Sequence, residues 1–317
     1  MDRPGLSPLR IALLGDGQWA ALSLHALRDG GYDLSGVVLR ERPSDDSLAE
    51  AAGELELPLF RPRRSDGDGL AAWIGSSRPD LLVSVAFDQI LRAPVRALAR
   101  LGALNFHAGK LPFYRGRNVI NWAIINGEEE IGVTGHWMDD GIDTGDIVLQ
   151  RTLPIGWTDT YGDVLHRVTA AIPALVVDTV ALVADGRGAG RSQRELPGTY
   201  CGGRGPGDEW FEWSATSEYL HNFIRGITRP GPGARTSLHG EEIIIWAAFF
   251  DRAWPRYLGN PGQVVGRSAE GVLVKTGDST LLVTEVESEA GGRCVPAWPI
   301  GTRLDVDRHS VAPARFA

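Results

Sequence analysis

The stretch from residue 10 to residue 190 alternates apolar, strand-like runs with longer helix-like runs, and this alternation constrains the fold more than any other feature. Strand-like RIALLG (10–15) and LSGVVLR (34–40) flank the helix-like run WAALSLHALRDGG (19–31). Further strand-like runs occupy 81–86, 102–107, 132–138 and 146–155. Strands that alternate with helices form right-handed crossovers and a mostly parallel sheet. We therefore predict an α/β, Rossmann-like domain over residues 1–188.

The alternation of strand-like and helix-like runs stops at a Gly- and Arg-rich segment with little periodicity, GRGAGRSQRELPGTYCGGRGPG (186–207). We interpret 189–207 as a linker. Beyond it, one helix-like run (215–227) precedes short β-type runs separated by Gly turns. Closely spaced short strands are typical of a small barrel. We predict an OB-like β-barrel domain over 208–317.

The chain has 317 residues, of which 43% are hydrophobic and 23% are charged, and this composition is typical of a globular protein. Neither a leader-like apolar segment nor an uninterrupted apolar run of about 18 residues occurs in it, so we expect neither export nor a membrane partner. Cys201 and Cys294 have neither zinc-site nor disulfide-framework spacing, which fits a cytoplasmic protein. The net charge of −8 argues against a nucleic-acid partner, which usually requires a basic face.

Three polar residues fall within a short stretch, LNFHAGKLPFYRGRNVINWAIINGEEEIGVTGHWMDDGIDTGD (104–146). Asn105 and His107 are two apart on an apolar strand, so their side chains leave the same face. Asp143 follows in the loop GIDTGD. An amide, an imidazole and a carboxylate together can polarise a carbonyl and move a proton. Asp139 and Asp140 make this loop densely acidic, and like charges close together raise one another's pKa, but the sequence does not show whether the pKa of Asp143 is raised.

A competing hypothesis rests on GDGQWA (15–20), a G-x-G-x-x-A turn after the first strand, with Glu41 near the end of the second strand. Such a turn and acid can bind a nicotinamide dinucleotide, which would indicate a dehydrogenase. The motif is weak, because any tight strand-to-helix turn needs Gly for backbone room.

The 104–146 stretch resembles the active-site signature of the folate-dependent formyltransferases. The family pattern N-x-H-x-x-x-L-P, then R-G with a Trp-bearing helix, then G-V-T and D-x-G-x-D-x-G is present in order. The resemblance implies an enzyme that uses N10-formyltetrahydrofolate as formyl donor, a primary amine as acceptor and no metal. It implies that Asn105 and His107 stabilise an oxyanion and that Asp143 orients His107. The implied donor site is the chain at Ala86, Phe87, Asp88, Gln89, Ile90, Leu91, Asp140, Gly141 and Ile142.

For the acceptor we expect a small amine, with a nucleotide-linked amino sugar as first choice and Tyr114, Arg115 and Arg117 as its binding residues. Methionyl-tRNA is the alternative; the acidic charge and the absence of a Lys-rich insertion at RERPSDDSLAE (40–50) argue against tRNA. A formyltetrahydrofolate hydrolase and a non-catalytic folate-binding module stay open. The chain could also pair as a homodimer.

Overall fold

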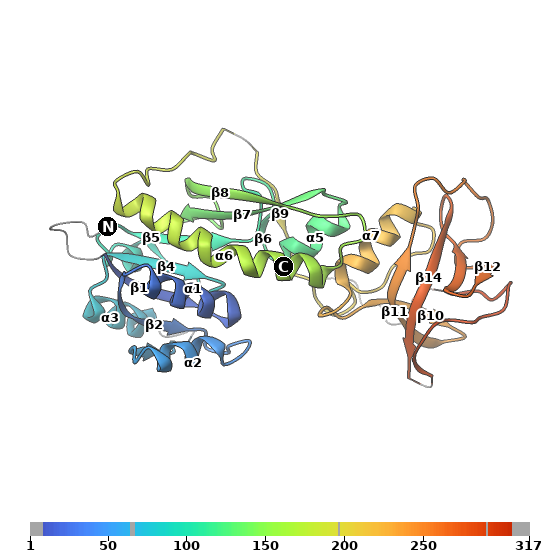
Figure 1. The fold of residues 1–317 in the computed structure, drawn as a ribbon, viewed down its shortest axis with the longest axis horizontal. Coiled ribbons are helices and arrows are strands. Elements are labelled where there is room, and N and C mark those ends of the chain that lie inside the picture. Colours follow the sequence, from blue (N-terminus) through green and yellow to red (C-terminus); the bar gives the residue numbers. More distant parts are fainter. Residues whose placement is uncertain (1–8, 64–66, 196, 290, 306–317) are drawn as a thin grey trace. The chain divides into compact units, whose positions relative to one another are not determined.

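The computed structural model describes residues 9–63, 67–195, 197–289 and 291–305. The chain divides into two compact units. The N-terminal unit holds the chain up to residue 116 together with 131–153 and 166–201, and the C-terminal unit holds 117–130, 154–165 and the chain from 202 onward. Each unit has its own sheet, coloured blue to green and orange to red respectively in Figure 1.

In the N-terminal unit, the described residues form one seven-stranded sheet of order β3-β2-β1-β4-β5-β7-β8 and a two-stranded sheet of β6 and β9 (Figure 1). The strands are β1 (Arg10–Gly15), β2 (Asp33–Leu39), β3 (Leu59–Phe60), β4 (Leu81–Val85), β5 (Ala103–His107), β6 (Arg115–Gly116), β7 (Glu130–Trp137), β8 (Ile147–Pro154) and β9 (Tyr200–Cys201). The helices are α1 (Gly17–Asp29), α2 (Ser47–Glu54), α3 (Gly67–Ser77), α4 (Ala93–Arg96) and α6 (Tyr161–Ala184), of which α6 begins in the C-terminal unit.

Both faces of this sheet are covered, which explains the continuous apolar runs of its strands. On one face, Leu14 and Leu82 pack with Leu70 and Ile74 around α3 in a buried cluster. On the other face, α1 and α6 are tied by a hydrogen bond from Trp19 Nε1 to Thr169 Oγ1 at 2.7 Å.

Helix α6 is, among the described helices, the one long and apolar enough to cross a membrane by length and composition alone. Its residues Ile172, Leu175, Val176 and Val180 are fully buried in the protein.

Strand β7 reverses the direction of the sheet. Strands β1, β2, β3, β4 and β5 pair in parallel, whereas β7 pairs antiparallel to β5. The register sets Ser84 of β4 opposite Asn105 of β5, and Asn105 opposite His136 of β7. Directly opposed residues project from the same face. Three polar side chains, those of Ser84, Asn105 and His136, therefore form a row across three neighbouring strands.

The C-terminal unit is an antiparallel sheet covered by helices. Its helices are α5 (Val119–Ile125) and α7 (Ser217–Ile227), and its strands are β10 (Ala234–Leu238), β11 (Glu241–Phe249), β12 (Val264–Ser268), β13 (Gly271–Lys275), β14 (Thr280–Ser288) and β15 (Gly292–Cys294). The strand order is β10-β11-β14-β13-β12, with β15 on β14. Residues 303–305 bridge to Ser237 of β10 and to Gln263 beside β12, which covers both edges of the sheet.

Helix α5 packs into this second core although it lies early in the sequence. Ile125 belongs to the buried cluster that contains Phe211, Phe223 and Ile245. Asn121 Nδ2 donates to the carbonyl oxygen of Gly226 on α7 at 2.7 Å. The predicted fold class, a mostly parallel α/β domain followed by a small β domain, is confirmed. The predicted boundaries at 188 and 208 stay a prediction.

Candidate active site

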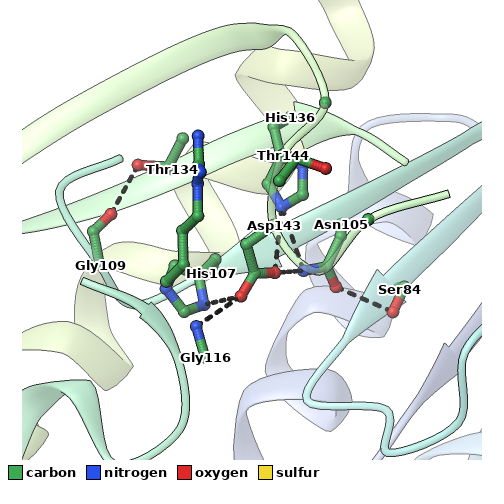
Figure 2. Close-up of polar contacts among 12 residues, drawn as sticks. Ser84, Asn105, His107, Gly109, Gly116, Thr134, His136, Asp143 and Thr144 are labelled. Carbon is green, nitrogen blue, oxygen red and sulfur yellow. Dashed lines mark hydrogen bonds and ion pairs between the residues drawn. The ribbon is translucent and has the colours of Figure 1, made fainter. Parts of the chain in front are cut away.

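The polar row is held by hydrogen bonds at the carboxyl ends of β4 and β5 (Figure 2). The hydroxyl of Ser84, which is 2% exposed, donates to Asn105 Oδ1 at 3.0 Å. This fixes the amide so that Asn105 Nδ2 faces His136 Nε2 at 3.2 Å and Asp143 Oδ1 at 3.3 Å. The backbone carbonyl of Trp137 lies 2.8 Å from His136 Nδ1, so Nε2 is the ring nitrogen of His136 that faces both Asn105 and Asp143. Sequence reasoning missed Ser84, whose one signal is a hydroxyl inside the apolar run LLVSV.

His107 lies at the end of β5 with its ring buried and both nitrogens engaged. Its Nε2–H donates to the carbonyl oxygen of Tyr114 at 2.6 Å, and Nδ1 lies 3.6 Å from Asp143 Oδ2. The ring packs so closely on Gly109 that a Cβ there would lie 2.4 Å from His107 Nε2. Burial lowers the pKa of His107, against the opposing effect of the Asp143 carboxylate. Because Nε2 keeps its proton on Tyr114, Nδ1 is the nitrogen able to take and release one beside the carboxylate.

Asp143 joins the two histidines (Figure 2). Its Oδ2 accepts the backbone N–H of Gly116 at 2.9 Å, and its Oδ1 lies 3.5 Å from His136 Nε2. The sequence leaves open whether the pKa of Asp143 is raised, and in the structure it is lowered. Burial alone would raise the pKa of Asp143, but the His136 hydrogen bond, the charge of His107 and the Gly116 N–H together lower it to about 2. Asp140 is instead turned away, in an ion pair with Arg96 at 2.7 Å. The structure thus brings Asn105, His107 and Asp143 together.

The predicted donor segments 86–91 and 140–142 lie beside this trio in the N-terminal unit. Ala86, with φ of 58°, turns the chain at the end of β4. Arg96 ties the two segments, because it donates to the carbonyl oxygen of Leu91 at 2.5 Å and to Asp140 at 2.7 Å. Within 86–91 and 140–142, Phe87 and Asp88 are half-buried, Leu91 is buried, and Asp140 and Gly141 are exposed.

These segments have the chemistry that a pterin requires. Ile90 and Ile142 are 68% and 53% exposed, so they offer apolar surface. The amide nitrogen of Gln89 is buried and has no hydrogen-bond partner among the described residues. Buried polar groups normally find a partner. A planar ligand with apolar faces and polar edges would satisfy both features, so the residues fit a reduced folate.

The glycine at position 15 of the GDGQWA turn is explained by close packing. A Cβ at Gly15 would lie 2.5 Å from Ala20 Cβ and 2.6 Å from the Val85 carbonyl oxygen. The buried Asp16 carboxylate stands at the start of α1, where it accepts the N–H of Ser44 at 3.0 Å and pairs with Arg40 at 3.1 Å. A negative charge there opposes a dinucleotide phosphate. Glu41 is exposed.

The three residues predicted to bind the acceptor have different environments in the structure. Tyr114 has φ of 57° and uses its carbonyl oxygen to hold His107. Arg115 is 7% exposed and its Nη2 donates to Gln193 Oε1 at 2.9 Å. Arg117 is exposed and belongs to the C-terminal unit, near Gly203. Their contact with an acceptor stays a prediction.

Two family profiles match the chain in sequence order. The formyl transferase profile matches residues 9–180, and the profile of the formyl transferase C-terminal domain matches residues 205–298. The chain belongs to the formyl transferase family. It is therefore an enzyme of one-carbon transfer that uses N10-formyltetrahydrofolate as donor, and the dehydrogenase hypothesis falls.

Relatives of known name cover nearly the whole chain. It is 37% identical over 297 residues to the methionyl-tRNA formyltransferase of Symbiobacterium thermophilum, covering 90% of each chain. It is 34% identical over 294 residues to that of Pelotomaculum thermopropionicum, covering 90% of this chain and 93% of the relative. In fold it is similar to the N-formyltransferase of Helicobacter canadensis solved with folinic acid and dTDP-3-aminofucose, with TM-score 0.68, 18% identity, and coverage of 87% and 98%.

The sequence prediction against tRNA is contradicted by these relatives, which are methionyl-tRNA formyltransferases. The prediction relied on a net charge of −8 and on the absence of a Lys-rich insertion at 40–50. Net charge is a sum over the whole surface and does not describe the local field at one face.

Proposed function

We propose that this formyl transferase acts on methionyl-tRNA, formylating the α-amino group of the attached methionine. The observation that carries the proposal is identity of 34–37% to methionyl-tRNA formyltransferases over 90% of the chain, which spans both units. The Helicobacter canadensis likeness supports the fold and does not bear on the acceptor. We place the reaction in the cytoplasm, where aminoacylated tRNA is found and where the free Cys201 and Cys294 stay reduced.

The trio has a defined task in this reaction. N10-formyltetrahydrofolate, when bound, supplies the formyl group that the amine attacks. His107 Nδ1 takes the proton that the amine loses and returns it to the folate nitrogen as the bond from that nitrogen to the formyl carbon breaks, and Asp143 stabilises the intervening imidazolium at 3.6 Å. Asn105 Nδ2 gives an N–H to the developing oxyanion by releasing Asp143, the longer of its two contacts at 3.3 Å. One such donor is worth about 2.7–4 kcal/mol of transition-state stabilisation in enzymes that use an oxyanion hole.

The test offers purified protein three acceptors in the presence of N10-formyltetrahydrofolate. These are methionyl-tRNA, a dTDP-linked amino sugar, and water alone, with products read by mass spectrometry and Asp143→Asn as the control for contaminating activity. We expect N-formylmethionyl-tRNA. Formylation of the amino sugar with methionyl-tRNA unchanged would overturn the proposed acceptor, and formate release independent of any amine would indicate a hydrolase.

A salt titration adds a second readout. Five arginines among the described residues of the C-terminal unit are paired with acids: Arg229 with Glu285, Arg235 with Glu242, Arg252 with Glu218, Arg293 with Glu285 and Arg303 with Asp305. Each phosphate contact contributes a slope of about 0.7–0.9 to the loss of log affinity with log salt. With so many arginines already neutralised, we expect a shallow slope for methionyl-tRNA, equivalent to few phosphate contacts.

A further inference from the structure

The backbone at Asp143 is held in a conformation that it would not adopt freely. Its φ is 54°, in the left-handed region. This region is sparsely populated by residues other than glycine and persists only where surrounding contacts impose it. The direction of the Asp143 carboxylate depends on this backbone, so whatever holds the backbone also sets the distance from Asp143 to His107.

Gln193 supplies that hold. Its side-chain amide is buried, and Nε2 donates to the carbonyl oxygens of Asp143 at 3.1 Å and Gly145 at 2.6 Å. Both amide hydrogens are used, one on each side of Thr144. The loop is therefore fastened on both flanks of Thr144 by one side chain from a segment that the sequence analysis interprets as a linker.

Arg115 fixes Gln193 in turn. Its Nη2 donates to Gln193 Oε1 at 2.9 Å, which decides that the nitrogen of the Gln193 amide faces the loop. Arg115 lies on β6, pairs in register with Tyr200 of β9, and places its guanidinium 5.5 Å from the centre of the Tyr200 ring. A Cβ at Gly198 would lie 2.4 Å from Arg115 Nη1, so the chain passes the arginine at a distance that only glycine allows.

The next residue on β6 completes the arrangement. Gly116, directly after Arg115, donates its backbone N–H to Asp143 Oδ2 at 2.9 Å. The carboxylate of Asp143 is thus oriented by β6, and its backbone is oriented by β6 through Arg115 and Gln193.

We infer that Gln193 and Arg115 are positioning residues that hold the catalytic carboxylate of Asp143 at its working distance from His107. The inference rests on formyl transfer as the family's chemistry and is independent of the acceptor. In this arrangement Arg115 acts through Gln193 and does not bind the acceptor directly.

The first test needs no acceptor. The pKa of His107 is measured by NMR titration of its Cε1–Hε1 group, with the resonance assigned through His107→Asn, in the full-length protein and in its variants. Gln193→Met keeps the side-chain length and removes both N–H donors, and Gln193→Glu keeps the shape but sets a carboxylate against two carbonyl oxygens. In both variants we expect the pKa of His107 to fall towards that in Asp143→Asn, because the carboxylate that stabilises the imidazolium moves away. Gln150→Met is the matched control, since Gln150 donates to Leu111 and Thr134 and to neither Asp143 nor Gly145.

The second test separates positioning from substrate contact. With any acceptor that the wild type formylates, Gln193→Met and Arg115→Lys should lower kcat by about 10- to 100-fold, the size of effect expected from a misplacement near 1 Å, with little change in KM for the acceptor. Lysine cannot reproduce the planar fork that arginine presents to Gln193. A rise in acceptor KM with kcat intact in Arg115→Lys would assign Arg115 to the substrate. An unchanged His107 titration in both folded Gln193 variants would overturn the inference, and if one variant fails to fold, the other decides.

Discussion

Replacement of Asp143 by asparagine isolates the charge that the trio depends on. The two side chains have nearly the same shape, and asparagine can still accept the Gly116 N–H through its amide oxygen. What disappears is a negative charge 3.6 Å from His107 Nδ1. At an effective dielectric constant of about 20, two opposite unit charges at this distance attract by about 4–5 kcal/mol. At about 1.4 kcal/mol for each factor of ten in rate, losing this attraction in the transition state slows proton transfer by about 10³-fold.

The assay is single-turnover formyl transfer with Asp143→Asn in excess over N10-formyltetrahydrofolate, so that product release does not mask the chemical step. Calorimetric binding of a stable folate analogue is the control, and we expect it to be near normal because the segments 86–91 and 140–142 keep their apolar surface. A chemical step within tenfold of the wild-type rate would refute the argument that this carboxylate is coupled to His107.

Three further predictions concern the Ser84 hydroxyl, the packing of Gly15 and the titration of His107. Ser84→Ala removes the donor to Asn105 Oδ1, so we expect a loss of about 1–3 kcal/mol in unfolding free energy and a lower kcat, measured by urea titration and steady-state kinetics; unchanged stability and kcat would contradict this role of the hydroxyl. Gly15→Ala should cost about 1–3 kcal/mol through overpacking, whereas Gly53→Ala, whose Cβ meets nothing within 4 Å, should cost nothing in the same titration. Because burial lowers the pKa of His107, the unfolded chain binds this proton more readily, so the unfolding free energy should fall as pH drops below about 6.5; the fall should be smaller in His107→Asn, and equal slopes would argue against it.

The sequence predicts this fold well where the burial of an element determines the pattern of apolar and polar residues along it. Strands such as β1 and β4 are almost entirely apolar because both faces of the sheet are covered, and the two-residue spacing of Asn105 and His107 alone predicts a shared face. The direction of a strand relative to its neighbour leaves no such pattern in the sequence. The contact between Asn105 and His136 arises because β7 runs antiparallel to β5, which neither residue's neighbours reveal.

Gln193 shows a second limit. It lies among glycines and arginines without periodicity, and its importance comes from two carbonyl oxygens about fifty residues earlier in the chain. The sequence could not decide the direction of the pKa shift of Asp143 for a related reason. The adjacent acids Asp139 and Asp140 suggested repulsion, while the groups that decide its ionisation, His136, His107 and Gly116, come from other strands.

The placement of α5 has a consequence for how such enzymes can be taken apart or recombined. Because Ile125 and Asn121 complete the surface on which α7 packs, a fragment beginning near residue 205 would lack part of its own core and expose apolar side chains to water. Cutting the chain once therefore cannot yield an intact second unit. Exchange of this unit between relatives would have to carry residues 117–130 and 154–165 along with the tail, so that a single genetic crossover should produce aggregation-prone hybrids.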